Sequence, residues 1–272
     1  MSLLIIAGLT LLLMAWIAGE PLLVEWRRNR VRSRPFPAAW RRIIRRRVPF
    51  FRNLPPDLQM RLKKHIQVFL AEKPFIGCGG IDITDEMRVT IAAQACLLIL
   101  ERRAHFYPQL RQILVYPDAF VVDRFQPEPS GVVQERRHAL SGESWSQGQV
   151  ILSWADVLEG AAIVDDGHNV VMHEFAHQLD QEAGHANGAP QLGRRERYAR
   201  WSRVLSAEYE ALSQRALAQE PSLINPYGAT NAAEFFAVVT EVFFEQPQRL
   251  AAEHPALYAE LAGFYRLDPA SW

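Results

Sequence analysis

The sequence Val170-Val171-Met172-His173-Glu174-Phe175-Ala176-His177 contains the five-residue pattern His-Glu-x-x-His. On an α-helix, side chains four residues apart project from the same face, so both imidazoles can reach a single zinc ion. Glu174 then lies beside the water molecule that the ion activates, which is the arrangement of a zinc peptidase. The alternative is a chance match, in which the two histidines are ordinary residues of a hydrophobic core.

The residues around the pattern favour a helix. Residues 165–169, Asp-Asp-Gly-His-Asn, offer capping side chains and early negative charge, and Gly184 provides a stop. Within the helix, Met172, Phe175, Ala176 and Leu179 can bury the faces that do not carry the histidines. We therefore expect a helix that is packed on most sides and presents its metal ligands rigidly.

A catalytic zinc ion usually takes three protein ligands, and Glu234 is the best candidate for the third. Asn231 is a predicted N-cap, which makes Glu234 the third residue of an apolar helix. Glu241 lies two turns further on nearly the same face, where it can accept a hydrogen bond from a ligand histidine. Alternatively, either glutamate caps the helix or pairs with an arginine.

These segments resemble the Mlc titration factor A family of bacterial zinc peptidases, whose catalytic core is similar to that of anthrax lethal factor. The resemblance implies a zincin-like core that binds one zinc ion per chain through His173, His177 and Glu234, and a Tyr227 that assists at the metal. It extends over roughly residues 50 to 270. The residues that carry it are His173, Glu174, His177, Leu179-Asp180, Tyr227 to Val238, and the segments 113–117, 120–123, 141–145 and 150–154.

The chemistry of the residues predicts their roles in such a site. Glu174 acts as the general base, because it can take a proton from water and later pass it to the leaving amine. Tyr227 can donate a hydrogen bond to the oxyanion, and the alternative is a core tyrosine with its hydroxyl at the surface. Asp180 returns to the metal face and suits the orientation of a ligand imidazole, or it is a plain surface aspartate.

Peptide binding is predicted less firmly. Residues 149–154, Gln-Val-Ile-Leu-Ser-Trp, form a predicted strand whose exposed edge can pair with an extended peptide, or which is simply a core strand. The other six histidines lack ligand spacing and are treated as structural or surface residues. Cys78 and Cys96 resemble no metal pair, and two unpaired thiols suit a reducing cytoplasm.

The N-terminus predicts a membrane anchor over residues 1–26. Residues 2–19 carry no charge and are dominated by Leu, Ile, Ala and Met, and a basic segment at residues 27–50 follows. By the positive-inside rule, the catalytic domain then lies on the cytoplasmic side of a bacterial inner membrane. A cleaved signal peptide and a soluble cytoplasmic protein are the alternatives, and the anchor departs from the soluble members of the family.

The distribution of charge argues against a nucleic-acid partner. The chain has 30 basic and 30 acidic residues, and its arginines concentrate near the N-terminus, so the later part is net acidic. The run Arg41-Arg42-Ile43-Ile44-Arg45-Arg46-Arg47 is instead interpreted as a contact with anionic lipid headgroups.

The remaining residues, 51–272, are enough for one peptidase domain. We predict an α+β fold that is mostly helical, with a small sheet and the anchor helix in front. Expected elements are helices from about Pro56 to Glu72, Glu86 to Glu101, Arg194 to Glu220 and Pro255 to Tyr265, short paired strands near Ile113 to Asp123, and a loop from Arg124 to Gly131.

Three functions remain open from the sequence. The first is a membrane-anchored zinc peptidase that cleaves a peptide or protein substrate. The second is a regulatory zinc protein that binds and sequesters a transcriptional repressor or another partner, as the resemblance suggests. The third is a structural protein at the membrane without a metal.

Overall fold

A four-stranded sheet forms the middle of the molecule. In this computed structural model, β1 (Phe75–Gly77), β2 (Gln112–Tyr116), β6 (Gln149–Ser153) and β5 (Gly142–Trp145) lie in the order β1-β2-β6-β5. The first three strands are parallel and β5 is antiparallel to β6. The described residues are 2–102, 105–118, 120–127, 133–140, 142–145, 148–182 and 184–272, without the side chains of 2–9, 11–13, 15–18 and 120–145.

Two predictions about the strands are wrong. The expected pairing between short strands near residues 113–123 does not form, because β2 pairs with β1 and β6, whereas β3 (Phe120–Pro127) pairs with β4 (Val133–Leu140). The first part of the expected loop, residues 124–127, belongs to β3, and residues 128–131 lie outside the described residues. Residues 149–153 form a strand as expected, but β6 has neighbours on both sides and no free edge, so the edge strands of this sheet are β1 and β5.

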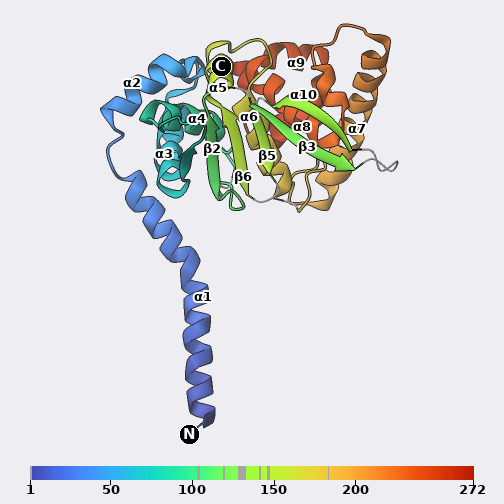
Figure 1. The fold of residues 1–272 in the computed structure, drawn as a ribbon. Coiled ribbons are helices and arrows are strands. Elements are labelled where there is room, and N and C mark those ends of the chain that lie inside the picture. Colours follow the sequence, from blue (N-terminus) through green and yellow to red (C-terminus); the bar gives the residue numbers. More distant parts are fainter. Residues whose placement is uncertain are drawn as a thin grey trace.

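Helices cover the sheet and make the fold α+β and mostly helical, as predicted (Figure 1). The helices predicted from Pro56 to Glu72 and from Pro255 to Tyr265 are confirmed at both ends, and the other two expected helices form within a few residues of the predicted bounds. The helices are α1 (Ser2–Arg32), α2 (Ala38–Arg47), α3 (Pro56–Glu72), α4 (Asp85–Leu97), α5 (Trp154–Ala162), α6 (Val170–Gln181), α7 (Arg195–Ala218), α8 (Ala232–Glu245), α9 (Pro247–Glu253) and α10 (Pro255–Tyr265), with short 3-10 helices at Pro49–Arg52, Pro226–Ala229 and Pro269–Ser271.

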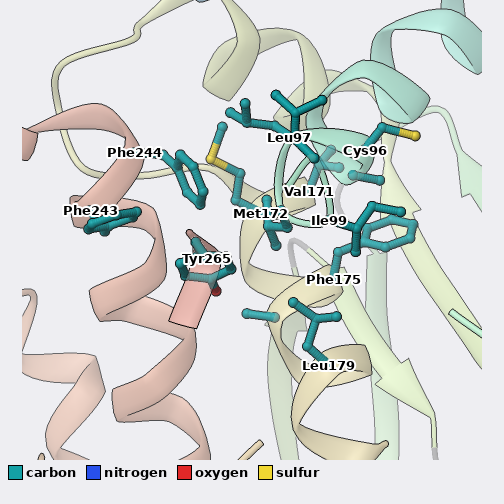
Figure 2. Packing of buried hydrophobic residues seen from close by; sticks show 14 of the residues in the cluster. Cys96, Leu97, Ile99, Val171, Met172, Phe175, Leu179, Phe243, Phe244 and Tyr265 are labelled. Atoms are coloured by element: carbon teal, nitrogen blue, oxygen red, sulfur yellow. The ribbon is translucent and has the colours of Figure 1, made fainter. Parts of the chain in front are cut away.

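Helix α6 lies in the middle of the hydrophobic core. Its residues Val171, Met172, Phe175 and Leu179 are at most 1% exposed. Figure 2 shows these side chains between two groups from other elements: Cys96, Leu97 and Ile99 on one side, and Phe243, Phe244 and Tyr265 on the other. The apolar positions expected from the sequence therefore hold this helix between α4 on one side and α8 and α10 on the other.

The N-terminal region contributes to the same core. Ile44 and Val48 are each 1% exposed and belong to the main hydrophobic cluster, although the prediction started the domain at residue 51. Helix α1 forms where the anchor was expected and projects from the body of the molecule (Figure 1). In the described part of the chain, however, no helix combines the length and the apolar character that crossing a membrane requires.

Replacing Phe175 by Ala tests the central position of α6. The Phe175 ring is fully buried, 4.8 Å from the Tyr107 ring and 5.8 Å from the Phe69 ring, measured between centroids. Loss of a buried phenylalanine ring should lower the free energy of unfolding by about 3–5 kcal/mol, as measured by urea denaturation. The control, Leu217→Ala, removes a side chain that is 87% exposed and should change stability by less than about 0.5 kcal/mol. Equal effects of the two changes would contradict this packing.

Candidate metal site

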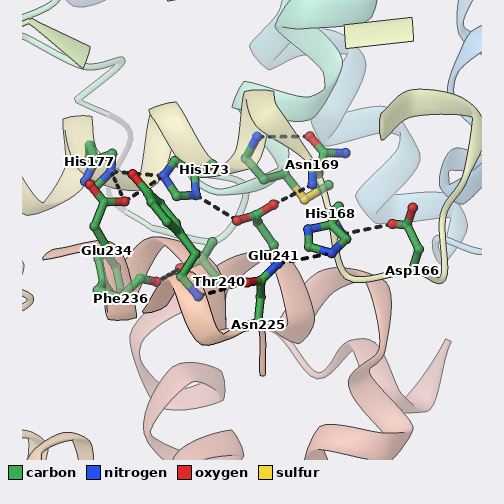
Figure 3. A network of polar contacts seen from close by, with 12 residues as sticks. Asp166, His168, Asn169, His173, His177, Asn225, Glu234, Phe236, Thr240 and Glu241 are labelled. Carbon is green, nitrogen blue, oxygen red and sulfur yellow. Dashed lines mark hydrogen bonds and ion pairs between the residues drawn. The ribbon is translucent and has the colours of Figure 1, made fainter. Parts of the chain in front are cut away.

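Helix α6 begins at a cap that fixes the direction of its histidines. Asn169 has extended backbone angles, and its side-chain oxygen accepts a hydrogen bond from the Met172 N–H at 3.0 Å. Of the predicted capping segment, residues 165–169, it is therefore the last residue that caps the helix. With the apolar faces of the helix buried, His173 and His177 turn towards α8 (Figure 3).

Helix α8 supplies the facing carboxylates. Asn231 caps it as predicted and accepts hydrogen bonds from the Ala233 and Glu234 N–H groups, each at 3.0 Å. Glu234 is the third residue of the helix, and Glu241 lies seven residues later on the same side, next to His173. The two helices thus bring together residues that are about sixty positions apart in the chain.

Three atoms of these side chains form a compact triangle. His173 Nε2 lies 3.2 Å from His177 Nε2 and 3.0 Å from a Glu234 carboxylate oxygen, which is 3.4 Å from His177 Nε2. Ligand atoms about 2.0–2.1 Å from a tetrahedral zinc ion lie roughly 3.3 Å apart, so the spacing fits zinc. Among the described residues, His173, His177 and Glu234 are the set of side chains whose ligand atoms lie close enough together to hold a metal ion.

Glu241 orients the first of these imidazoles. Its Oε1 accepts a hydrogen bond from His173 Nδ1 at 2.7 Å, which turns Nε2, on the other side of the ring, towards Glu234 and His177. Its second oxygen accepts from the Asn169 backbone N–H. Glu241 is 5% exposed. Among the described residues, it contacts a histidine and a backbone amide and forms no ion pair with an arginine.

The electrostatics of the group favour positive charge at the triangle. Burial lowers the pKa of His173, but its hydrogen bonds to Glu234 and Glu241 outweigh this and raise the pKa to about 10. The pKa of Glu234 is raised by burial, but the two imidazoles lower it far below its usual value. Both shifts have the same cause: the carboxylates around the triangle favour a positive charge between the two imidazoles and Glu234.

Glu174 lies buried beside the triangle. It is 2% exposed, and its Oε2 has no hydrogen-bond partner among the described residues. Burial raises its pKa to about 8, with His173 opposing and the carboxylates of Glu234 and Glu241 adding to the shift. A carboxyl group with a pKa near neutrality is suited to both accepting and donating a proton.

Tyr227 stands at the open side of the site. Its side chain is 53% exposed, so it is not the core tyrosine of the alternative interpretation, and its ring centroid is 6.1 Å from that of His173. The Asn225 side chain accepts a hydrogen bond from the Tyr227 N–H at 2.8 Å and contacts His168 Nε2 at 3.3 Å. The loop before α6 is therefore linked to the short helix that carries Tyr227.

Asp180 has a different place from the one expected. It is completely buried, and its carboxylate accepts a hydrogen bond from the Gly188 N–H at 2.7 Å, not from a ligand imidazole. Trp201 donates to the Gly188 carbonyl at 2.8 Å, so the loop after α6 is held from two sides. Asp180 thus orders this loop and acts on His177 only through space.

The sequence interpretation missed the part that Asn169 and Glu245 play. The Asn169 side-chain amide donates to the Gly160 carbonyl at 3.1 Å and to Glu245 at 3.0 Å, in addition to its capping contact. One side chain therefore joins α5, α6 and α8. The available signal was the i,i+4 spacing of Glu241 and Glu245, which places a further carboxylate on the same face.

Comparisons with known proteins agree with this site. A family model described as glucose-regulated metallo-peptidase M90 matches residues 23–266. An uncharacterised protein of Synechocystis is 46% identical over 264 residues, covering 96% of each chain. Proteins called Mlc titration factor A are also similar: that of Escherichia fergusonii is 34% identical over 82% of this chain and 84% of its own, and that of Yersinia pestis is 31% identical over 90% and 89%.

Replacing Glu241 by Gln tests its part in metal binding. The amide keeps the size of the side chain but loses the charge that orients His173, so zinc affinity should fall about 10- to 100-fold. Competition with a chromophoric chelator measures this affinity. Glu210→Gln, on the exposed face of α7, is the matched control and should leave the affinity unchanged. If zinc bound Glu241→Gln as tightly as the native chain, this orienting contact would be irrelevant to the metal.

Replacing Glu245 by Gln should change the pH dependence of stability. Burial raises the pKa of Glu245 to about 9, with the Asn169 hydrogen bond opposing and Asp166 and Glu241 adding to the shift. Since the folded pKa lies above that of the unfolded chain, stability from this group is present below about pH 4.5 and is lost as pH rises towards 9. Urea denaturation measures the difference in the free energy of unfolding between Glu245→Gln and the native chain. This difference should be more favourable to the variant at pH 8 than at pH 5. A constant difference, like that expected for exposed Glu220→Gln, would refute the shift.

Proposed function

Because the chain belongs to the glucose-regulated metallo-peptidase M90 family, we propose that it is a zinc-dependent peptidase. In this proposal His173, His177 and Glu234 hold one zinc ion, and Glu174 is the general base. The observation that carries it is the ligand triangle, with sides of 3.0–3.4 Å, beside a buried carboxyl group that has an unpartnered oxygen.

A zinc ion in this position supplies Lewis acidity, which makes water acidic enough to lose a proton near neutral pH and polarises a substrate carbonyl. Residues of the chain carry out the proton transfer and stabilise the developing charge. Glu174, buried beside the ligand triangle, accepts the proton of the attacking water and delivers it to the leaving amine nitrogen. Tyr227, exposed beside His173, donates a hydrogen bond to the negative charge that develops on the carbonyl oxygen.

Regulation by partner binding is the second candidate function. The relatives called Mlc titration factor A carry a name that states a titration of Mlc, and the alignment with the Escherichia fergusonii protein covers 82% of this chain. By analogy, this chain would sequester a repressor protein and keep its metal for structure. The two functions differ in whether the Glu174 carboxylate is required.

The Glu174→Gln variant separates these functions. Glutamine cannot accept the proton of the attacking water, so peptide cleavage should fall by at least about 100-fold while zinc remains bound in a one-to-one ratio. Mass-spectrometric identification of new peptide termini measures cleavage in a bacterial extract. Zinc content is measured on the same preparations.

The control is Glu210→Gln, which should generate the same termini as the native chain. Native-like cleavage by Glu174→Gln would reject the peptidase mechanism. Identical termini with and without native protein, together with retained binding of a repressor, would favour the regulatory function.

A further inference from the structure

Helix α2 has an apolar side that is fixed to the body and a basic side that faces solvent. Ile44 is 1% exposed, and the indole N–H of Trp40 donates to Asp85 at 3.0 Å. Arg47 pairs with Glu86 at the start of α4. The opposite side carries Arg41, Arg42 and Arg45, all exposed. The orientation of these arginines is therefore set by the packing of the helix.

The basic charge on this side has no local compensation. Residues 27–52 contain 11 arginines and no acidic residue, whereas the rest of the chain has 19 basic and 30 acidic residues. Among the described residues, no ion pair connects Arg41, Arg42 or Arg45 to a carboxylate. Like charges left together on a fixed surface repel one another, so an anionic partner would stabilise them.

Neighbouring elements enlarge the same cluster. Arg52, in the turn after α2, donates to the Arg45 carbonyl at 2.9 Å. Burial lowers the pKa of Lys63 on α3, and the positive charges of Arg41 and Arg45 lower it further. We call Arg41, Arg42, Arg45, Arg52 and Lys63 the basic surface.

Exposed apolar side chains occur next to this surface in the chain. Leu22, Leu23 and Trp26 of α1 are 74%, 53% and 58% exposed. The end of α1 is held to α3 by the ion pair of Arg28 with Glu72, and Figure 1 shows the C-terminal end of α1 at the side of the body that carries α2 and α3. Exposed leucine and tryptophan beside arginine are typical of a segment that lies in a lipid interface, and a nucleic acid would make no use of them.

We propose that the basic surface binds anionic phospholipid headgroups, with Leu22, Leu23 and Trp26 entering the interface. Arginines bind phosphate with two parallel hydrogen bonds, and their charge adds to the attraction of an anionic leaflet. The metal site takes no part in this contact, so the inference is independent of the proposed peptidase activity. It places the protein at the cytoplasmic face of a bacterial membrane, where anionic lipids and arginine-rich segments meet.

Co-sedimentation with vesicles tests the proposal on the full chain. The probes are vesicles of phosphatidylcholine with phosphatidylglycerol and vesicles of phosphatidylcholine alone. The triple variant Arg41→Gln, Arg42→Gln, Arg45→Gln should bind the anionic vesicles roughly 100-fold more weakly, because each basic residue near an anionic surface contributes about fivefold. Binding to phosphatidylcholine alone reports the apolar N-terminal residues and should be the same for both chains.

The matched control is Arg195→Gln, Arg203→Gln, Arg215→Gln on α7. It removes the same charge from exposed positions of a helix that also carries three glutamates, and it should bind anionic vesicles like the native chain. If both triple variants lost the same vesicle affinity, net charge alone would explain the binding and the proposal would be overturned. So would native-like binding by the α2 variant, or displacement of the native chain from the vesicles by duplex DNA at equal phosphate concentration.

Discussion

The hydrogen bonds that Glu241 accepts are the contacts on which the site depends. One oxygen accepts a hydrogen bond from Nδ1 of His173 and the other accepts one from the backbone N–H of Asn169, so a single carboxylate fixes both the orientation of this imidazole and the start of its helix. Since Glu241 and Glu234 share α8, the same contacts align Glu234 with the two histidines. The triangle thus follows from the register of α6 against α8, which Asn169 and the apolar faces of both helices maintain.

That register requires four carboxyl groups to lie close together in a largely buried region. Glu174, Glu241 and Glu245 are each less than 10% exposed, and Glu234 completes the set. Such a cluster is unfavourable for folding unless protons or a cation neutralise it. The raised pKa of Glu174 and Glu245 favours the protonated form of these two groups, whereas the lowered pKa of Glu234 favours a carboxylate beside a cation.

The sequence predicted the local parts of this arrangement better than the long-range ones. The caps at Asn169 and Asn231 and the helix Pro255–Tyr265 follow from side-chain chemistry within a few residues, and the structure confirms them. The pairing of β2 with β1 and β6 depends on contacts between distant segments, so local patterns could not reveal it. Asp180 shows the same limit within the site. Its spacing indicated the metal face, but its carboxylate accepts a hydrogen bond from the Gly188 N–H in the loop after α6. The partners of Asn169 on α5 and α8 were equally out of reach of a sequence pattern.

X-ray absorption spectroscopy at the zinc edge, on the protein loaded with one equivalent of zinc, tests directly whether these side chains bind the metal. We expect two imidazole nitrogens and a carboxylate oxygen at about 2.0–2.1 Å, and loss of the carboxylate contribution and of tight binding in Glu234→Ala. A zinc environment without two imidazoles, or a spectrum that Glu234→Ala leaves unchanged, would contradict this expectation.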